Sequence, residues 1–115
     1  MNATPVLVEV KAGSSPAPVN PGAEGVLPVA ILGSSALDVR GIDASSMRLG
    51  VGEAAPRNGA HIDDVNGDGI PDLTLQFPTQ DAGVQCGDTA IIVSGRTTSG
   101  ATIAGFDTIR TVGCP

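Results

Sequence analysis

Asp64-Val65-Asn66-Gly67-Asp68-Gly69-Ile70-Pro71-Asp72, followed directly by Leu73-Thr74-Leu75-Gln76-Phe77, is the stretch of this sequence that decides the fold. In its second half, Leu, Leu and Phe alternate with Thr and Gln, which is the period of a half-buried β-strand. In its first half, oxygen-bearing side chains stand at positions 1, 3, 5 and 9, and a glycine at position 6 permits a sharp turn. The sequence therefore predicts a tight loop that leads into a strand.

The spacing of these side chains is typical of a calcium site. A hard divalent cation binds six to eight oxygens at about 2.3 to 2.6 Å, and alternate residues of a tight turn point their side chains at one centre. We expect four side-chain ligands, the last of them direct or through water, and one backbone carbonyl. The predicted ligands of Ca²⁺ are Asp64, Asn66, Asp68, Ile70 (carbonyl) and Asp72. Asp63 precedes the pattern. We expect its side chain to lie in solvent or next to one of the metal-ligating residues; the alternative is that it competes with Asp64 for the metal.

The loop departs from an EF-hand at its twelfth position. Leu75 stands there, where an EF-hand has a bidentate Glu. We therefore expect strands rather than helices on both sides of the loop. An ordinary Asp/Asn/Gly turn is the alternative interpretation, but such a turn does not require four correctly spaced side-chain oxygens.

Composition predicts an all-β fold. The chain has 115 residues with sixteen Gly and nine Pro, which interrupt the apolar runs too often for helices of normal length. Two Phe and no Trp or Tyr leave the core to Val, Ile, Leu and Ala. We expect one domain over residues 1–115, excised from a longer secreted protein.

Apolar alternation and turn signals place about seven short strands along the chain, at residues 6–11, 25–32, 47–51, around 61–62, 73–77, 90–94 and 102–112. We expect an extended, proline-rich connection at residues 13–22 and an irregular or edge position at Pro28 in a strand buried on both faces. A helical turn capped by Asp43 is expected at residues 43–46, and a turn at Asn58-Gly59. Strands of this length and spacing are typical of a β-sandwich.

Charge and motifs exclude several classes of function. Twelve acidic and six basic residues give a net charge of −6, and the scattered basic residues form no stripe for nucleic acid. No apolar stretch is long enough for membrane insertion, and the opening Met1 to Pro5 does not have the pattern of a signal peptide. His61 is the only obvious neutral-pH base, and no nucleophile motif accompanies it, so we do not expect an enzyme.

The two cysteines, Cys86 and Cys114, allow more than one interpretation. Their spacing alone leaves open a disulfide, a pair of buried thiols and, least favoured, a metal-binding pair. Beside a calcium loop, they favour a secreted or cell-surface location, because disulfides persist in oxidising compartments and extracellular calcium is millimolar.

Several segments together carry a resemblance: GVLPVAILG at 25–33, MRLG at 47–50, DDVNGDG at 63–69 with PDL at 71–73, CGDT at 86–89 and TIRTVGC at 108–114. They resemble a calcium-binding, immunoglobulin-like module that recurs near the C-termini of secreted bacterial proteins. The similarity covers nearly the whole chain. It implies an immunoglobulin-like β-sandwich with one calcium-binding loop and a disulfide between Cys86 and Cys114.

The resemblance transfers no biochemical activity. We expect a non-catalytic extracellular module in which Ca²⁺ stabilises a loop between strands and the domain acts as a spacer or an adhesion or accessory unit. The alternative is a carbohydrate- or cell-surface-binding accessory module of a secreted enzyme. Sugar rings usually stack on aromatic side chains, and the candidates here, Phe77 and Phe106, are both expected in the core. The partner would be an extracellular protein or a polysaccharide.

Overall fold

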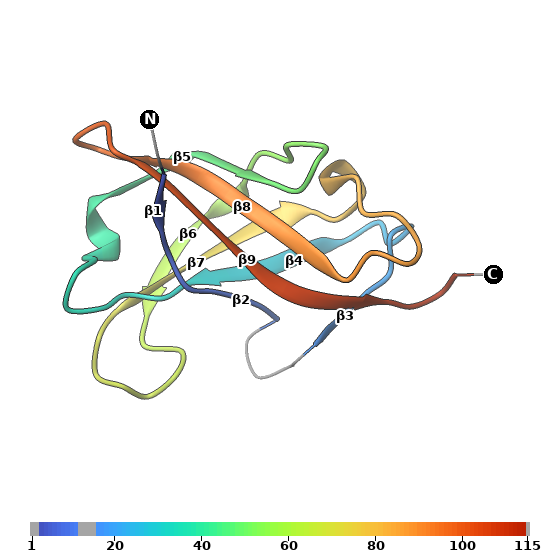
Figure 1. Cartoon of the computed structure of the whole chain (residues 1–115), viewed down its shortest axis with the longest axis horizontal. Coiled ribbons are helices and arrows are strands. Elements are labelled where there is room, and N and C mark those ends of the chain that lie inside the picture. The colour runs from blue at the N-terminus through green and yellow to red at the C-terminus, as the bar shows by residue number, and fades with distance from the viewer. Residues whose placement is uncertain (1–2, 12–15, 115) are drawn as a thin grey trace.

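Two β-sheets make up this protein in a computed structural model, which describes residues 3–11 and 16–114 (Figure 1). The all-β class is therefore confirmed. The strands are β1 (Thr4–Pro5), β2 (Val8–Val10), β3 (Ala17–Val19), β4 (Val26–Ile31), β5 (Ile42–Leu49), β6 (Arg57–Asp63), β7 (Asp72–Pro78), β8 (Ala90–Thr97) and β9 (Thr102–Thr111). Two short 3-10 helices, η1 (Val39–Gly41) and η2 (Gln80–Ala82), lie between them. No helix in these residues has the length and apolar character needed to cross a membrane.

The two sheets have a sandwich-like arrangement. One sheet has the strand order β2-β4-β7-β6, and its neighbours are all antiparallel. The other has the order β1-β9-β8-β5, with β3 also paired to β9. The described residues thus hold nine strands where about seven are expected, because β1 and β3 are short additions on the edge of β9.

The first strands alternate between the sheets. β1 pairs parallel to β9, β2 pairs antiparallel to β4, and β3 returns to pair parallel to β9. A hydrogen bond also joins the two sheets, because the Val10 N–H at the end of β2 donates to Oδ2 of Asp107 in β9 at 2.9 Å. The expected connection at 13–22 therefore contains a strand at 17–19, and its residues 13–15 lie outside the described part of the chain.

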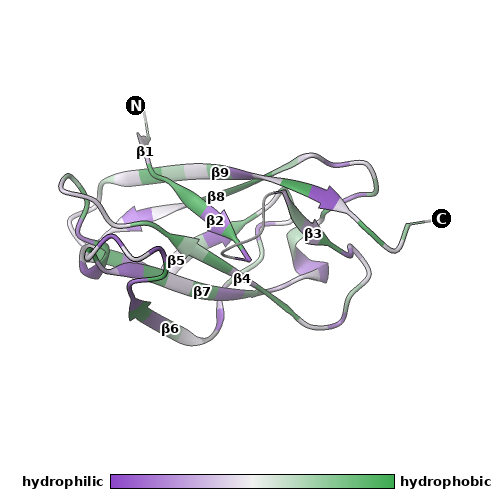
Figure 2. Ribbon diagram, turned by 90° about the horizontal axis from the view of Figure 1, so that it is seen from below, coloured by the Kyte–Doolittle hydropathy of each residue, from purple (hydrophilic) through white to green (hydrophobic). Residues whose placement is uncertain are grey.

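The core lies between the sheets and receives alternate side chains from both. Leu73, Leu75 and Phe77 of β7 point inward, as the alternation predicts, and all three are buried. The other sheet contributes Met47 and Leu49 from β5, together with apolar residues of β8 and β9. Figure 2 shows the corresponding mixture of apolar and polar positions along the strands. This core orients the two ends of β7, and one of these ends carries the predicted metal loop.

β4 differs from its prediction in two ways. Leu27, Val29 and Ile31 are buried on one face. On the other face Ala30 is buried but Val26 and Pro28 are half-buried, so the predicted burial on both faces is confirmed only toward Ile31. β4 is also an inner strand rather than an edge. The Pro28 carbonyl accepts from the N–H of Lys11, which lies one residue past the end of β2, at 2.9 Å. The N–H and C=O of a residue in an antiparallel ladder point to the same side, so the missing N–H of Pro28 would also face Lys11. Proline is tolerated because the neighbouring strand ends there.

The predicted turns at 43–46 and 58–59 are wrong, and both segments belong to strands. Residues 43–46 lie in β5, whose register against β8 shifts between Asp43 and Arg48. The capped turn is instead η1, where the Asp38 side chain accepts from the Arg40 N–H. Gly59 lies within β6 with a φ of 79°, beside a register shift between Arg57 and Ala60. A positive φ at an irregularity in the ladder is typical of a bulge.

Candidate metal centre

The predicted loop joins the antiparallel strands β6 and β7. Asp63, the last residue of β6, pairs with Asp72, the first residue of β7, so residues 64–71 form a closed hairpin loop. The hairpin holds the two ends of the loop close together, which is the condition for ligands at positions 1 and 9 to share one ion. Strands therefore flank the loop on both sides, as expected.

Asp72 anchors this loop to the rest of the molecule. Its side chain is completely buried. The Gly33 N–H donates to Oδ1 of Asp72 at 2.8 Å, and the Val65 N–H donates to Oδ2 at 2.9 Å. One carboxylate thus joins the start of the loop, the start of β7 and the segment after β4. Because Gly33 is 39 residues away in the chain, the pattern of the loop alone does not predict this contact.

Asp64 orders the exposed part of the loop. Its Oδ1 accepts from the Gly67 N–H at 2.9 Å and its Oδ2 accepts from the Gly69 N–H at 2.8 Å. Both glycines have positive φ, 76° and 83°, which lets their N–H groups turn toward the carboxylate. The hydrogen bond from Gly69 is the main cause of a lowered pKa of Asp64, opposed in part by desolvation. Asp64 therefore stays ionised at neutral pH.

The remaining polar side chains of the loop contact its backbone. Oδ1 of Asp68 accepts from the Ile70 N–H at 2.9 Å, and Oδ1 of Asn66 has a long contact of 3.4 Å with the Asp68 N–H. Oδ1 of Asp63 accepts from the N–H of Asp64 at 2.8 Å. Bonds of this kind hold the side-chain oxygens in one orientation before any ligand is present.

Asp64, Asp68 and Asp72 converge. One carboxylate oxygen from each lies within 4.8 Å of the others, and the cluster combines two exposed side chains with one buried side chain. Three carboxylate oxygen donors at this separation suit a hard divalent cation. The structure thus brings together three of the five predicted ligands as a group that could hold a metal ion. Asn66 and the carbonyl of Ile70 belong to the same loop and stay predictions as ligands.

The two cysteines form a disulfide. Cys86, in the connection between β7 and β8, is bonded to Cys114, with their Cα atoms 5.9 Å apart. The Gly87 N–H also donates to Oγ1 of Thr111 at 2.9 Å. The last residues of the chain are thereby joined to the loop before β8. This end of the molecule lies opposite the loop between β6 and β7 in Figure 1.

Phe77 and Phe106 have different environments. Phe77 is fully buried, as expected, but Phe106 has 63% of its surface exposed, so the prediction of a core position for Phe106 is wrong. In β9, Ile103 and Ile109 point into the core, and Phe106 is an odd number of residues from each, so it faces outward. His61, which the sequence analysis names as the only obvious neutral-pH base, lies exposed on β6 opposite Thr74. It is not a member of the acidic cluster.

Comparisons with known proteins give no relative. No protein-family model matches this chain, and no characterised protein or solved structure is significantly similar to it.

Proposed function

We propose that this chain is a non-catalytic extracellular calcium-binding module, in which Ca²⁺ stabilises the loop between β6 and β7. The domain then acts as a spacer, adhesion or accessory unit. The observation that carries the proposal is the convergence of Asp64, Asp68 and Asp72 within 4.8 Å, with Asp72 buried and anchored by two backbone N–H groups.

The residues of the loop perform distinct tasks in this proposal. Asp64 and Asp68 supply exposed carboxylates, and the Gly69 and Ile70 N–H groups hold them in place. Asp72 supplies the carboxylate that is connected to Gly33 and the adjoining sheet. Asn66 and the Ile70 carbonyl complete the proposed ligand set. Bound Ca²⁺ would neutralise carboxylates that repel one another, and its contribution to stability grows with the logarithm of free calcium above Kd.

The disulfide at one end of the molecule and the acidic loop at the other are both compatible with an extracellular location. A disulfide persists outside the cytosol, and millimolar extracellular calcium saturates even weak oxygen-ligand sites. The fold and the disulfide therefore agree with a secreted or cell-surface module.

We also propose that the sandwich is immunoglobulin-like. A constant-type immunoglobulin domain has the sheets A-B-E-D and C-F-G. The sheet β2-β4-β7-β6 corresponds in chain order to A-B-E-D, and β5-β8-β9 corresponds to C-F-G. β1 and β3 are then additions that pair parallel to the last strand. In this frame the metal loop is the D–E hairpin.

Thermal unfolding under non-reducing conditions tests the calcium proposal. The protein is unfolded in excess EGTA, and again with about 0.1 to 10 mM calcium, a range that spans extracellular-module affinities. Magnesium at the same concentrations serves as the control. We expect a midpoint that rises with calcium and not with magnesium. An unchanged midpoint, together with the absence of calcium in metal analysis of the untreated sample, would contradict the proposal.

A pair of substitutions locates the site. Asp68→Ala removes an exposed carboxylate of the cluster, whereas Asp81→Ala removes an exposed carboxylate of η2 that lies outside it. We expect Asp68→Ala to abolish the calcium-dependent rise and Asp81→Ala to preserve it. Equal effects of the two substitutions would show that calcium acts through general charge screening rather than through this loop.

A carbohydrate- or surface-binding accessory role is the second candidate, and the exposure of Phe106 favours it. An exposed aromatic ring can stack on the apolar face of a sugar ring. Phe106 stands alone in this respect, because the chain has no Trp or Tyr. Phe106→Ala should lower retention of the protein in affinity electrophoresis with soluble polysaccharides if this role is correct.

A further inference from the structure

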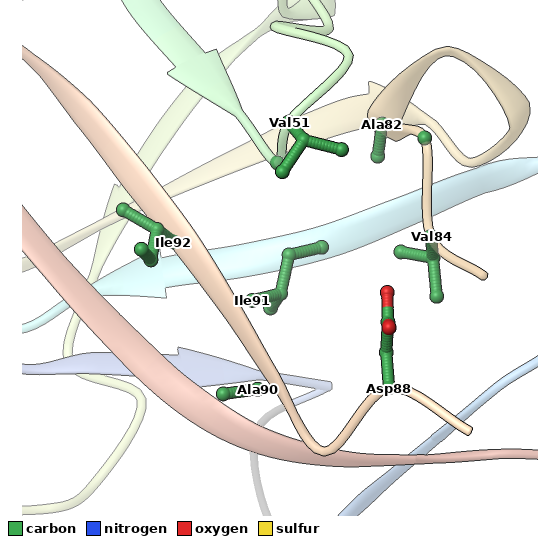
Figure 3. Close-up of a pocket in the computed structure, with 9 residues that line it drawn as sticks. Val51, Ala82, Val84, Asp88, Ala90, Ile91 and Ile92 are labelled. Atoms are coloured by element: carbon green, nitrogen blue, oxygen red, sulfur yellow. The ribbon is translucent and has the colours of Figure 1, made fainter. Parts of the chain in front are cut away.

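A pocket of about 210 Å³ opens where three segments of the chain meet (Figure 3). These segments are the turn after β5, the helix η2 with the residues that follow it, and the stretch that leads into β8. The side chains of Val51, Ala82, Val84 and Ile91 belong to the lining, so most of its wall is apolar. The pocket shares no residue with the loop between β6 and β7.

Backbone contacts hold the walls of the pocket together. The Gly50 N–H donates to the carbonyl of Ile92 at 2.7 Å, and the Gly52 N–H donates to the carbonyl of Ala82 at 3.0 Å. A Cβ at Gly50 would overlap the Ala82 carbonyl oxygen, so the turn and η2 lie backbone against backbone. Ala82 and Ile91 are themselves buried in the core. The hollow is therefore formed before any ligand arrives, as is usual for binding pockets.

Asp88 is the charged residue in the lining. Its Oδ2 accepts from the Gln85 N–H at 2.9 Å, and its own N–H donates to the Gln85 carbonyl at 3.0 Å. Figure 3 shows the carboxylate directed toward the space between Val84 and Ile91. Within residues 3–11 and 16–114, no group donates to Oδ1 of Asp88, and the ion pair found there joins Arg40 to Asp38. One carboxylate oxygen thus stays available at an apolar hollow.

The surroundings of the pocket are negatively charged. Asp81 directly precedes Ala82, and Glu53 follows Val51 by two residues; both acidic side chains are exposed. Among the described residues, no lysine, arginine or histidine lines the pocket. Acidic groups around an apolar hollow attract a ligand that combines a positive charge with an apolar part.

We propose that this pocket binds the side chain of a lysine from a partner protein. The methylene chain of the lysine fills the apolar hollow, and its ammonium group donates to Oδ1 of Asp88. Lysine has the required combination of a long apolar stem and a charged end. The volume of about 210 Å³ is below the range of roughly 300 to 1,000 Å³ for pockets that take whole small-molecule ligands. It suits one side chain rather than an oligosaccharide.

The hydrogen bonds of Asp88 favour lysine over arginine. An arginine binds a carboxylate best through two parallel N–H groups that need both oxygens. Here Oδ2 already accepts from the Gln85 N–H, which leaves Oδ1 for the ligand. A lysine ammonium is a compact charge that can donate to a single oxygen.

The lysine must come from a different protein. Lys11 is the only lysine in this sequence, and its Nζ donates to the Pro18 carbonyl at 2.7 Å in a half-buried position. A second copy of this chain therefore has no free lysine side chain to offer. Because the pocket lies outside the metal loop, we expect binding to be the same in calcium and in EGTA. A chain without a calcium response would leave this inference standing.

A titration followed by methyl NMR spectra tests the pocket, with n-butylammonium chloride as the probe for a lysine side chain. We expect saturable shifts of the methyl signals of Val51, Val84 and Ile91, with a dissociation constant on the order of 10 mM for so small a ligand. The control ligand 1-butanol has the same number of heavy atoms and no charge. It should bind about tenfold more weakly, because it lacks the charged hydrogen bond. Shifts that do not saturate, or equal binding of 1-butanol, would overturn the proposal.

Two substitutions locate the charge that binds the probe. Asp88→Asn removes the charge but keeps an oxygen for the Gln85 N–H, and it should weaken n-butylammonium binding about tenfold. Asp81→Asn is the matched control, because Asp81 is exposed nearby but does not line the pocket, and it should leave binding almost unchanged. Equal effects of the two substitutions would show that only the general negative charge attracts the probe. Binding of n-propylguanidinium as tight as that of n-butylammonium would overturn the choice of lysine.

Discussion

The two ends of the sandwich are closed by different chemistry. At one end, carboxylates of the loop between β6 and β7 accept hydrogen bonds from backbone N–H groups, and one buried carboxylate reaches across to Gly33. At the other end, the covalent bond between Cys86 and Cys114 joins the loop before β8 to the end of the chain. Figure 1 shows these two ends at opposite sides of the long axis.

This difference makes the two ends sensitive to different conditions. A disulfide contributes at any calcium concentration and is lost only on reduction. The acidic end contributes in part through Asp72 alone and, in our proposal, in part through bound calcium. The contribution of one end can therefore be varied while the other is held constant.

Removal of the disulfide should have the largest effect. The double substitution Cys86→Ser/Cys114→Ser opens a loop with a sequence separation of 28 residues. In the chain-entropy description this lowers the free energy of unfolding by about 3 to 4 kcal/mol. Urea unfolding with and without calcium measures the loss, which should be equal in both conditions. A calcium response that disappears with the disulfide would show that the two ends are coupled.

Asp72→Ala should have the next largest effect. It leaves the Gly33 and Val65 N–H groups without their acceptor at a buried site. We expect a loss of about 2 to 3 kcal/mol in EGTA, before any contribution of calcium is considered. Urea unfolding in EGTA is the measurement, with Asp68→Ala as the comparison. If Asp68→Ala costs as much in EGTA, then Asp72 has no special anchoring role.

Gly33→Ala should give a smaller loss at the same end. A Cβ at Gly33 would overlap the carbonyl oxygen of Pro71, so the backbone next to Asp72 must move. We expect a cost of about 1 to 3 kcal/mol and weaker calcium stabilisation. Gly25→Ala is the matched control, because a Cβ there meets nothing within 4 Å. Equal stability of the two variants would mean that the loop adapts without strain.

Asp38→Asn should have the smallest effect on stability. Asp38 lies neither in the acidic loop nor next to the disulfide. The hydrogen bonds and the charge of Arg40 lower the pKa of Asp38. The pair therefore adds to the free energy of unfolding at pH values above the usual carboxyl pKa, and this contribution is lost as the pH falls through the lowered pKa. Both side chains are exposed, so solvent screens the contribution. Thermal midpoints of the two proteins should coincide at about pH 2, below the carboxyl range, and differ little at pH 7. A large difference at pH 7 would contradict this.

Local patterns predicted the parts of the fold that depend on local chemistry. The alternation in Leu73 to Phe77 predicted β7, and the spacing of Asp64 and Asp68 predicted a tight carboxylate loop. The prediction of a helical turn at Asp43 failed because the Asp43 side chain can accept the same local hydrogen bond in either backbone. Here it accepts from Oγ of Ser45 within the strand β5. Capping residues alone do not distinguish these two backbones.

Contacts between distant segments were not predictable from the pattern. The role of Asp72 as an anchor depends on the Gly33 N–H, and the strand at Ala17–Val19 depends on the free edge of β9. Phe106 was expected in the core because Phe is usually buried. Its outward direction follows from the parity of β9, which is only known once Ile103 and Ile109 are seen to point inward.

The parallel pairing of the first strands with β9 determines how the protein bears mechanical force. β1 and β3 lie near the start of the chain, and β9 lies at its end. When the two termini are pulled apart, parallel neighbours slide along each other, and their hydrogen bonds are loaded together in shear rather than opened one after another. The disulfide next to β9 keeps residues 86–114 from extending even after these bonds break. A chain placed between two anchored neighbours would therefore lengthen only in part under tension.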